Sequence, residues 1–199
     1  MMAAGQPPLR LVLGSTSRYR AELLRRLCED FEQCAPGTDE SVRADEAPAA
    51  RAQRLAVAKA DATAVGLSDA VVIGSDQVAE LDGRLLDKPG TVANACAQLA
   101  ASRGRQLQFH TAVCVLDTRS GRRQLHVDLT RVRFRDLSTK EIARYVEREQ
   151  PLDCAGSFKC EGLGISLFEQ IDSLDPTALI GLPLIALARL LRECGMPLP

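Results

Sequence analysis

The chain has 199 residues, 46% of them hydrophobic and 26% charged, values that are typical of a globular protein and exclude a disordered one. Its 25 basic and 26 acidic side chains nearly cancel, so no global field would attract nucleic acid or an anionic membrane, and any phosphate binding must be local. This length predicts a single domain over residues 9–195, with short tails at 1–8 and 196–199.

Strand and helix patterns alternate in the first half of the chain. Residues 9–13 form a short apolar run of strand length, which is followed by Gly14-Ser15-Thr16-Ser17 and then by leucines at helical spacing. Residues 49–66 carry apolar side chains on one helical face, and residues 70–74 form a candidate buried strand. Because Ser75-Asp76 follows directly, this second strand is expected to end at an acidic residue.

A helix and a hairpin are expected next. Residues 93–102 have a helical pattern, and residues 107–117 and 125–134 flank a turn-rich Arg119-Ser120-Gly121. Ser138 stands three residues before Glu141, which is the pattern of a capping box, and it predicts a helix that continues to about residue 149.

The last part of the chain is marked by glycine and proline. Gly156, Gly162 and Gly164 indicate strands and tight turns close to something that approaches the backbone. Pro183 is expected to start a final helix and Gly195 to end it. The order of elements predicts an α/β fold with a mixed, twisted sheet flanked by helices.

Small hydroxyl residues and guanidinium groups follow the first expected strand, in Ser15-Thr16-Ser17 and Arg18-Tyr19-Arg20. Free backbone N–H groups, the positive end of a helix and Arg20 would together bind a polyphosphate. The same pattern also fits a serine N-cap followed by solvated arginines.

Two carboxylates are candidates for a catalytic site. Asp76 is expected at a strand end that faces a ligand crevice, and Glu40 follows an irregular segment. Converging carboxylates would hold Mg²⁺ or Mn²⁺, or one of them would deprotonate water, although ordinary turn acids are the alternative. Lys59 and Lys88 add candidate phosphate partners, and a solvated lysine is the alternative for Lys59.

Several kinds of site are excluded by missing residues. The chain has no P-loop pattern, and Gly162-Leu163-Gly164 lacks the third glycine and the strand-then-helix setting of a dinucleotide fingerprint. Cys154 and Cys160 have no close histidine pair, which argues against a zinc site. Only His110 and His126 occur in the chain, so histidine-based catalysis has almost no candidates.

The expected compartment follows from cysteines and hydropathy. Seven cysteines, an odd number, in a chain long enough to need no disulfides favour a reducing compartment. Residues 1–10 have no signal-like apolar stretch, and no run approaches the roughly 18 residues that span a bilayer. We therefore expect a soluble cytoplasmic protein that binds neither a membrane nor nucleic acid.

The order of several short motifs resembles the Maf family of nucleotide pyrophosphatases from about Leu9 to Gly195. The motifs are Leu13-Gly14-Ser15-Thr16-Ser17-Arg18-Tyr19-Arg20, Thr38-Asp39-Glu40, Ala58-Lys59-Ala60, Ile73-Gly74-Ser75-Asp76-Gln77-Val78, Leu86-Asp87-Lys88-Pro89, Cys154-Ala155-Gly156-Ser157-Phe158 and Gly181-Leu182-Pro183. The resemblance implies two lobes around a central cleft, a divalent metal, and release of pyrophosphate from a nucleoside triphosphate. A homodimer is implied in the same way.

The resemblance also implies roles for individual residues. Asp76 matches the proton-accepting acid of the family, and Ser15 and Arg20 match its phosphate-contacting loop. The remaining cleft residues match Glu40, Lys59 and Lys88. Glu40 and Asp76 would hold the metal, and whether Asp76 acts as base, as ligand or as both stays open.

Within the family, the chain looks most like the members that hydrolyse 7-methyl-GTP. The specificity positions match Tyr19, Gln77 and Glu161, although Arg18-Tyr19 stands where such members often have Pro-Trp. A carboxylate accepts both donors of a guanine edge, and a cationic 7-methylguanine favours an aromatic ring. The alternative for Tyr19 is an aromatic that packs on the core.

Three functions are compatible with these residues. The first is a 7-methyl-GTP pyrophosphatase, and the second is an enzyme with the same chemistry that acts on dTTP or UTP. The third is a noncatalytic nucleotide-binding regulator of cell division, against which the retained Asp76, Glu40 and two lysines argue.

Overall fold

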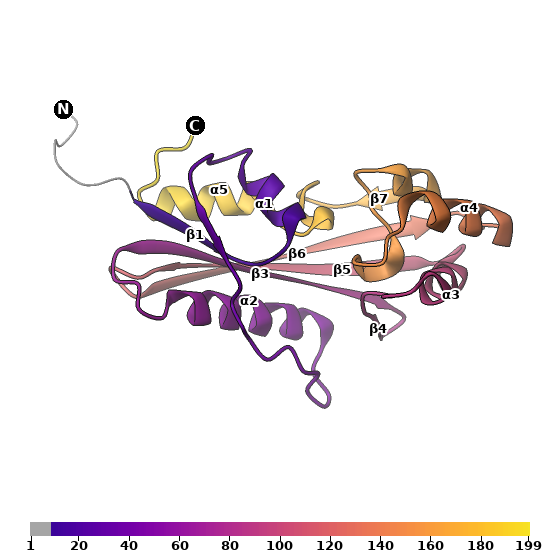
Figure 1. The fold of residues 1–199 in the computed structure, drawn as a ribbon, viewed down its shortest axis with the longest axis horizontal. Coiled ribbons are helices and arrows are strands. Elements are labelled where there is room, and N and C mark those ends of the chain that lie inside the picture. The colour runs from indigo at the N-terminus through magenta and orange to yellow at the C-terminus, as the bar shows by residue number, and fades with distance from the viewer. Residues whose placement is uncertain (1–8) are drawn as a thin grey trace.

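The structure is a computed structural model that describes residues 9–199, and its centre is a seven-stranded mixed sheet with helices on both faces (Figure 1). The predicted tail at residues 1–8 lies outside the described residues. Within residues 9–199, no helix is both long and apolar enough to cross a bilayer. The elements in chain order are β1 (Arg10–Gly14), α1 (Arg18–Leu24), β2 (Glu32–Cys34), α2 (Pro48–Ala64), β3 (Ala70–Leu81), β4 (Arg84–Leu86), α3 (Val92–Ser102), β5 (Gln106–Asp117), β6 (Arg122–Phe134), α4 (Thr139–Glu149), η1 (Ala155–Ser157), η2 (Leu163–Leu167), β7 (Phe168–Asp172), η3 (Ala178–Ile180) and α5 (Leu184–Glu193).

The sheet has the strand order β2-β1-β3-β5-β6-β7, and β4 adds to β3. Strand β1 runs parallel to β2 and β3, whereas the pairs β3–β5, β5–β6, β6–β7 and β3–β4 are antiparallel. The long β5–β6 pair is the predicted hairpin. The prediction of an α/β fold with a mixed sheet is therefore confirmed.

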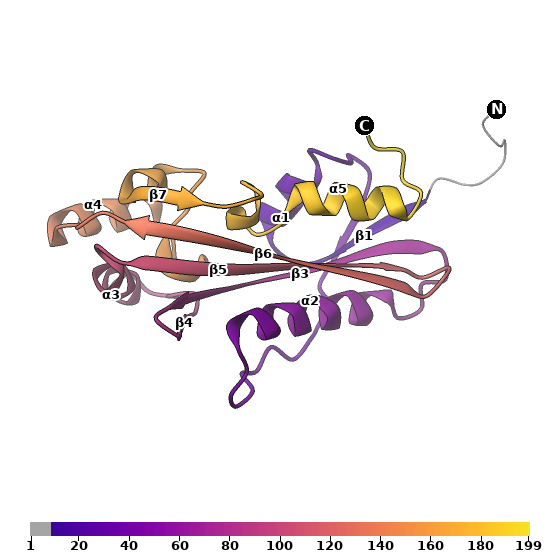
Figure 2. The same cartoon turned by 180° about the vertical axis from the view of Figure 1, so that it is seen from behind.

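Helix α2 covers one face of the sheet, and α1 and α5 cover the other face at the same end (Figures 1 and 2). The contact with α2 is close because two paired glycines, Gly14 and Gly74, lie beneath the helix. A Cβ at Gly74 would lie only 2.2 Å from the carbonyl oxygen of Ala56, and one at Gly14 only 2.3 Å from Thr63 Oγ1. Any larger residue would push α2 away from β3.

The opposite end of the molecule has a core of its own, with α3 and α4 beside the β5–β6 hairpin (Figure 2). Four phenylalanines meet there edge to face, with ring centroids 4.8–5.7 Å apart. The predicted capping box is confirmed: Ser138 accepts from the Glu141 N–H, and the Glu141 carboxylate accepts from the Ser138 N–H at 2.8 Å.

Strand β3 is longer than the sequence predicted. The strand was expected to end beside Asp76, but it continues to Leu81 and joins the two ends of the molecule. Gly74-Ser75 looks like a strand end in the sequence, whereas Gly74 is required by the close approach of α2. Asp76 thus lies in the middle of a strand, opposite Ala112 of β5.

The glycine-rich segment after α4 is only partly as predicted. It contains the short 3₁₀ turns η1 and η2 before a strand, β7, begins at Phe168. Tight turns are present, since Gly156 has a φ of +74° and a Cβ at Gly164 would lie 2.3 Å from the carbonyl oxygen of Lys159. A backbone carbonyl thus approaches Gly164, whereas the side chains of Phe109 and Glu149 approach Gly156 and Gly162. The last helix has Pro183 as its N-cap, and Gly195 follows its end.

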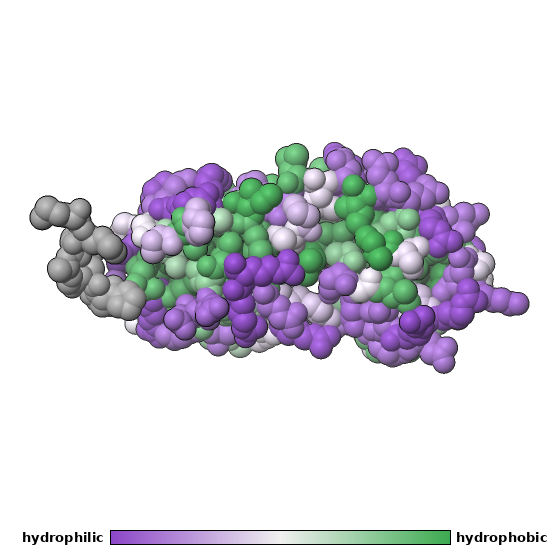
Figure 3. All heavy atoms as spheres, turned by 90° about the horizontal axis from the view of Figure 1, so that it is seen from above, coloured by the Kyte–Doolittle hydropathy of each residue, from purple (hydrophilic) through white to green (hydrophobic). Residues whose placement is uncertain are grey.

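Apolar surface is exposed among polar side chains on the face seen from above (Figure 3). Leu174, which follows β7, is 92% exposed, and Ile185 of α5 is 62% exposed. These two segments are joined, because the N–H of Ile185 donates to Asp175.

Two expectations from the sequence stay predictions. They are the assembly of two copies into a homodimer and the organisation of residues 9–195 as a single domain.

Candidate active site

A cleft opens where β3 has a free edge. Strand β1 pairs with β3 only as far as Gly14 opposite Gly74, and β4 pairs with β3 only from Ala79 onward. Between these points, among the strands of residues 9–199, none covers residues 75–78 on that side. The cleft has a volume of about 1020 Å³. It is lined by all nine residues singled out from the sequence, namely Ser15, Tyr19, Arg20, Glu40, Lys59, Asp76, Gln77, Lys88 and Glu161.

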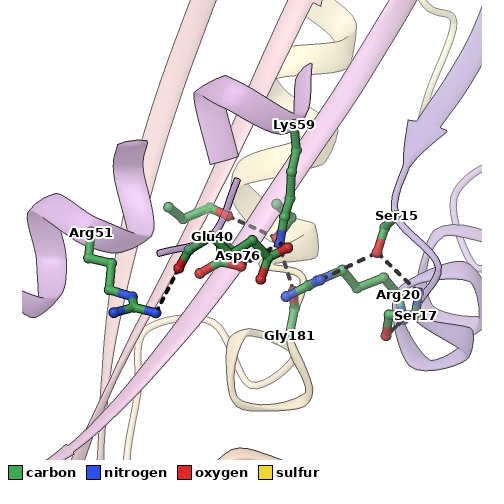
Figure 4. A network of polar contacts seen from close by, with 10 residues as sticks. Ser15, Ser17, Arg20, Glu40, Arg51, Lys59, Asp76 and Gly181 are labelled. Atoms are coloured by element: carbon green, nitrogen blue, oxygen red, sulfur yellow. Dashed lines mark hydrogen bonds and ion pairs between the residues drawn. The ribbon is translucent and has the colours of Figure 1, made fainter. Parts of the chain in front are cut away.

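One buried lysine holds two carboxylates at the centre of the cleft (Figure 4). Lys59 Nζ lies 2.6 Å from Asp76 Oδ1 and 2.8 Å from Glu40 Oε1. The side chains of Lys59 and Asp76 are 7% and 10% exposed, whereas that of Glu40 is 55% exposed. Within the described chain, no donor contacts Asp76 Oδ2, so this oxygen is available to a ligand.

The charges around Glu40 favour its ionised form. Burial by itself would raise the pKa of Glu40, but the hydrogen bond and charge of Lys59 outweigh it, and Lys88 and Arg20 act in the same direction. The resulting pKa lies below the ordinary value of a glutamate. Glu40 therefore brings a negative charge to the cleft at neutral pH.

Arg20 is fixed by two contacts on the other side of the carboxylates. Its Nε donates to the carbonyl oxygen of Gly181 at 2.9 Å, and its Nη1 donates to Ser15 Oγ at 3.3 Å. Burial lowers the pKa of the Arg20 guanidinium, and the charges of Asp76 and Glu40 oppose this shift. A charged group so placed is held ready for an anion.

The loop before α1 is shaped by its serines. Ser17 is the N-cap of α1 and accepts from the N–H of Arg20, while Ser15 Oγ accepts from the N–H of Ser17 at 3.2 Å. The serine N-cap expected as the alternative is therefore present. Ser15 and Arg20 also line the cleft. The loop can therefore contain a serine N-cap and still bind phosphate.

Lys88 lies at the rim of the cleft. Its side chain is exposed, and it makes no ion pair or hydrogen bond among residues 9–199. A solvated amine of this kind is free to move onto a bound anion.

Gln77 is oriented by the chain around it. Its Nε2 donates to Ala178 O at 2.9 Å, to Leu179 O at 3.1 Å and to Thr111 Oγ1 at 3.1 Å. Because backbone carbonyls can only accept, the amide nitrogen must face them. The amide oxygen, which has no partner in the described part of the chain, is left for a ligand.

Tyr19 is half-buried, and the guanidinium of Arg18 packs over its ring. The Arg18 guanidinium lies 4.8 Å from the ring centroid, and the hydroxyl contacts Asp153 at 3.4 Å. Burial raises the pKa of Tyr19 to about 12, partly offset by the hydrogen bond from Arg18, so the phenol is neutral. Tyr19 lines the cleft and is also partly packed on the protein, so its role in recognising the nucleobase stays a prediction beside the alternative of an aromatic packed on the core.

Glu161 lines the cleft and is exposed, and its nearest hydrogen-bonding neighbour is the thiol of Cys160, 3.6 Å away. Cys154 and Cys160 also line the cleft. Burial raises the pKa of each of these thiols to about 12, so neither is ionised at neutral pH.

A protein-family model and curated relatives both match nearly the whole chain. The family model described as Maf-like protein matches residues 10–194. The chain belongs to the Maf family. It is 60% identical over 191 residues to a protein of Xanthomonas oryzae pv. oryzae named 7-methyl-GTP pyrophosphatase, covering 96% of this chain and 99% of that one.

A second Maf relative carries the same name. This protein, from Burkholderia pseudomallei, is 56% identical over 194 residues, which cover 96% of this chain and 90% of the relative. The predicted enzyme class, a hydrolase that acts on acid anhydrides, is thereby confirmed. Among solved structures, the Ham1 protein of Staphylococcus aureus is similar with a TM-score of 0.44 and 15% identity, over 64% of this chain and 72% of that one.

The donors in this Maf cleft fit a hard divalent cation. Glu40 and Asp76 converge from a loop and a strand, and Asp76 Oδ2 is free. No group of three histidine, cysteine or acidic residues that could hold a metal occurs among residues 9–199. Mg²⁺ commonly binds through one or two carboxylates together with substrate phosphates, so two carboxylates suffice.

Sequence reasoning missed three features of the cleft. Gly181, part of a noted motif, orients Arg20 and accepts from Ser75 through its carbonyl oxygen. Lys159 also lines the cleft, with its Nζ bonded to the carbonyl of Glu149. Arg51 lies on the same face of α2 as Lys59, eight residues earlier, and this spacing was visible in the sequence.

Proposed function

We propose that this Maf protein hydrolyses 7-methyl-GTP to 7-methyl-GMP and diphosphate. The observation that carries the proposal is the buried Lys59, which holds Asp76 and Glu40 together at the open edge of β3. Curated relatives named for this activity cover nearly the whole chain. The first supports a charged centre in the cleft, and the second supports the pyrophosphatase chemistry that we propose there.

Asp76 is proposed as the group that takes the proton from water. Its Oδ1 is held by Lys59, so Oδ2 is the oxygen that would face the water. The water oxygen bonds to the α-phosphorus while the bond from that phosphorus to the oxygen bridging to the β-phosphate breaks. The proton passes to Asp76 and the electron pair leaves on pyrophosphate.

Three cations are proposed to stabilise the charge that develops. Arg20 is already oriented by Gly181 and Ser15, and Lys59 by the two carboxylates. Lys88 is exposed and can follow the leaving group. Fixed cations in a partly dry cleft act more strongly on a phosphoryl group than the same cations in water.

Glu40 and Asp76 are the residues that would hold Mg²⁺ or Mn²⁺. When bound, such an ion polarises phosphoryl oxygens and neutralises their charge. Glu40 stays ionised because the Lys59, Lys88 and Arg20 charges lower its pKa.

Hydrogen-bond acceptors and an aromatic ring are proposed to recognise the nucleobase of the substrate. A guanine edge offers two N–H donors, which suit the exposed carboxylate of Glu161, and the free amide oxygen of Gln77 is a further acceptor. A cationic 7-methylguanine would stack on Tyr19. Since Arg18 occupies one face of that ring, the base takes the other face or displaces Arg18.

A panel of pyrophosphate-release assays tests the proposal. The purified protein is assayed with 7-methyl-GTP, GTP, dTTP and UTP, each with Mg²⁺ and with Mn²⁺. We expect the highest kcat/KM on 7-methyl-GTP. A higher kcat/KM on dTTP or UTP would show that the protein is a pyrimidine nucleotide pyrophosphatase instead. Nucleotide binding without release of pyrophosphate would favour a noncatalytic regulator.

A further inference from the structure

Arg51 of α2 has no role in the chemistry described so far, although its side chain lines the cleft. Arg51, Leu55 and Lys59 follow one another at steps of four residues and all line the cleft. Residues at this spacing share one face of a helix. The face that carries the central lysine therefore carries a second cation two turns earlier.

The guanidinium of Arg51 is only partly used by the protein. Its Nη2 donates to the backbone carbonyl of Glu40 at 3.1 Å (Figure 4). Its Nη1 is shielded from solvent and has no acceptor among the residues that the structure describes. A charged donor without an acceptor is unfavourable, so a conformation that gives this nitrogen an acceptor is favoured. Because Nη1 is closed to solvent, a phosphate oxygen in the cleft would reach it after the guanidinium turns toward the cleft.

The position of Arg51 indicates which part of a substrate would supply the acceptor oxygen. In Figure 4, Arg51 and Arg20 lie on opposite sides of Glu40 and Asp76. Tyr19, which is proposed above to stack on the base, precedes Arg20 on α1, so the proposed function would put the nucleoside end of the substrate on the Arg20 side. With the α-phosphorus beside Asp76, the β- and γ-phosphates of such a substrate would extend toward Arg51.

We propose that Arg51 binds the pyrophosphate part of the substrate while it holds the Glu40 loop. The proposal rests on the proposed function, because it takes the α-phosphorus to lie beside Asp76. A planar guanidinium suits this task, since it can donate to the Glu40 carbonyl and to a phosphate oxygen at the same time.

Arg54 provides a matched control on the same helix. Its Nη2 donates to the carbonyl of Ser41 at 3.2 Å, and its Nε bonds Glu46 at 2.6 Å. It thus anchors the same loop, but it is not among the residues that line the cleft. A purely structural role for Arg51 would make Arg51→Gln and Arg54→Gln behave alike.

The experiment measures pyrophosphate binding by calorimetry with Mg²⁺, alongside kcat and KM for 7-methyl-GTP. We expect Arg51→Gln to weaken pyrophosphate binding by about tenfold or more, with a similar rise in KM, and Arg51→Lys to recover part of the loss. The Kd for 7-methyl-GMP should change by less than about twofold, as should the pyrophosphate Kd of Arg54→Gln.

Unchanged pyrophosphate binding in Arg51→Gln would overturn the proposal, and so would an equal loss in Arg54→Gln. If Arg51→Gln does not fold, the pyrophosphate Kd of Arg51→Lys is compared with that of the wild type instead. Calorimetry also separates the two hypotheses: a wild-type protein that binds pyrophosphate but releases none from any triphosphate contradicts the proposed function, while the Arg51 comparison still gives its own answer.

Discussion

Lys59 Nζ donates to Asp76 Oδ1 at 2.6 Å, and both side chains are almost closed off from water. Charges in such a place are stable only because each has the other as partner. The second carboxylate on Lys59, Glu40, is more exposed and can exchange its contact for a ligand. The buried pair therefore holds the centre of the cleft in place while its exposed side remains adjustable.

Asp76→Asn should remove most turnover and leave nucleotide binding largely intact. The amide is nearly isosteric with the carboxylate but cannot accept the proton, and a general base contributes roughly 10²–10⁴-fold in rate. The measurement is kcat for 7-methyl-GTP together with its Kd. More than about a tenth of wild-type turnover would show that Asp76 is not the base.

Lys59→Met should lower the free energy of unfolding by about 3 kcal/mol, because it leaves a buried carboxylate without its partner. The double variant Lys59→Met with Asp76→Asn should lose less than the sum of the two single variants, since no buried charge is then unpaired. Urea unfolding of all four proteins measures the coupling. Strictly additive losses would mean that the two side chains do not stabilise each other.

Activity should disappear in excess chelator and return with Mg²⁺ or Mn²⁺. Without a cation, Glu40 and Asp76 repel the triphosphate that they surround. Pyrophosphate release is measured before and after exhaustive metal removal, with zinc added back separately. Full activity after metal removal would contradict the mechanism, and zinc is expected to be unnecessary.

Glu161→Gln should reduce kcat/KM on 7-methyl-GTP far more than on dTTP or UTP. The amide loses one acceptor and turns a donor toward the guanine donors, and such a mispairing costs about 1–3 kcal/mol, or roughly 5- to 150-fold. Steady-state kinetics on each nucleotide measure the change. Equal losses on all substrates would show that Glu161 does not read the base.

The capping box of α4 gives a pH-dependent contribution to stability. Hydrogen bonds from Ser138, assisted by Arg135, lower the pKa of Glu141 to about 2, against about 4.3 for an ordinary glutamate. Because the folded-state pKa is lowered, this contribution is present above the unfolded pKa and is lost as the pH falls toward 2.

Glu141→Gln should therefore lower the urea midpoint at pH 7, and its difference from wild type should shrink as the pH is lowered below about 5. Glu147→Gln on the same helix is the control, since its carboxylate is exposed and makes no hydrogen bond within residues 9–199. A difference that grows on acidification would contradict the assignment.

Much of the fold was readable from local patterns. The capping box at Ser138, the hairpin of β5 and β6, and helix α2 all depend on residues close together in the chain, and the structure has them where they were expected. The end of β3 was not predictable in this way. Gly74 resembles a strand end, and only the contact with α2 shows why it is a glycine.

The sequence by itself determined the Maf family and the nine residues that line the cleft, because the order of short motifs is a property of the chain alone. Only the tertiary structure decided how these residues act on one another. The pairing of β1 with β3 leaves the edge beside Asp76 open, and carbonyl groups from the segment around Gly181 orient Gln77 and Arg20. Such contacts join residues about a hundred positions or more apart, and strand register and helix packing bring them together.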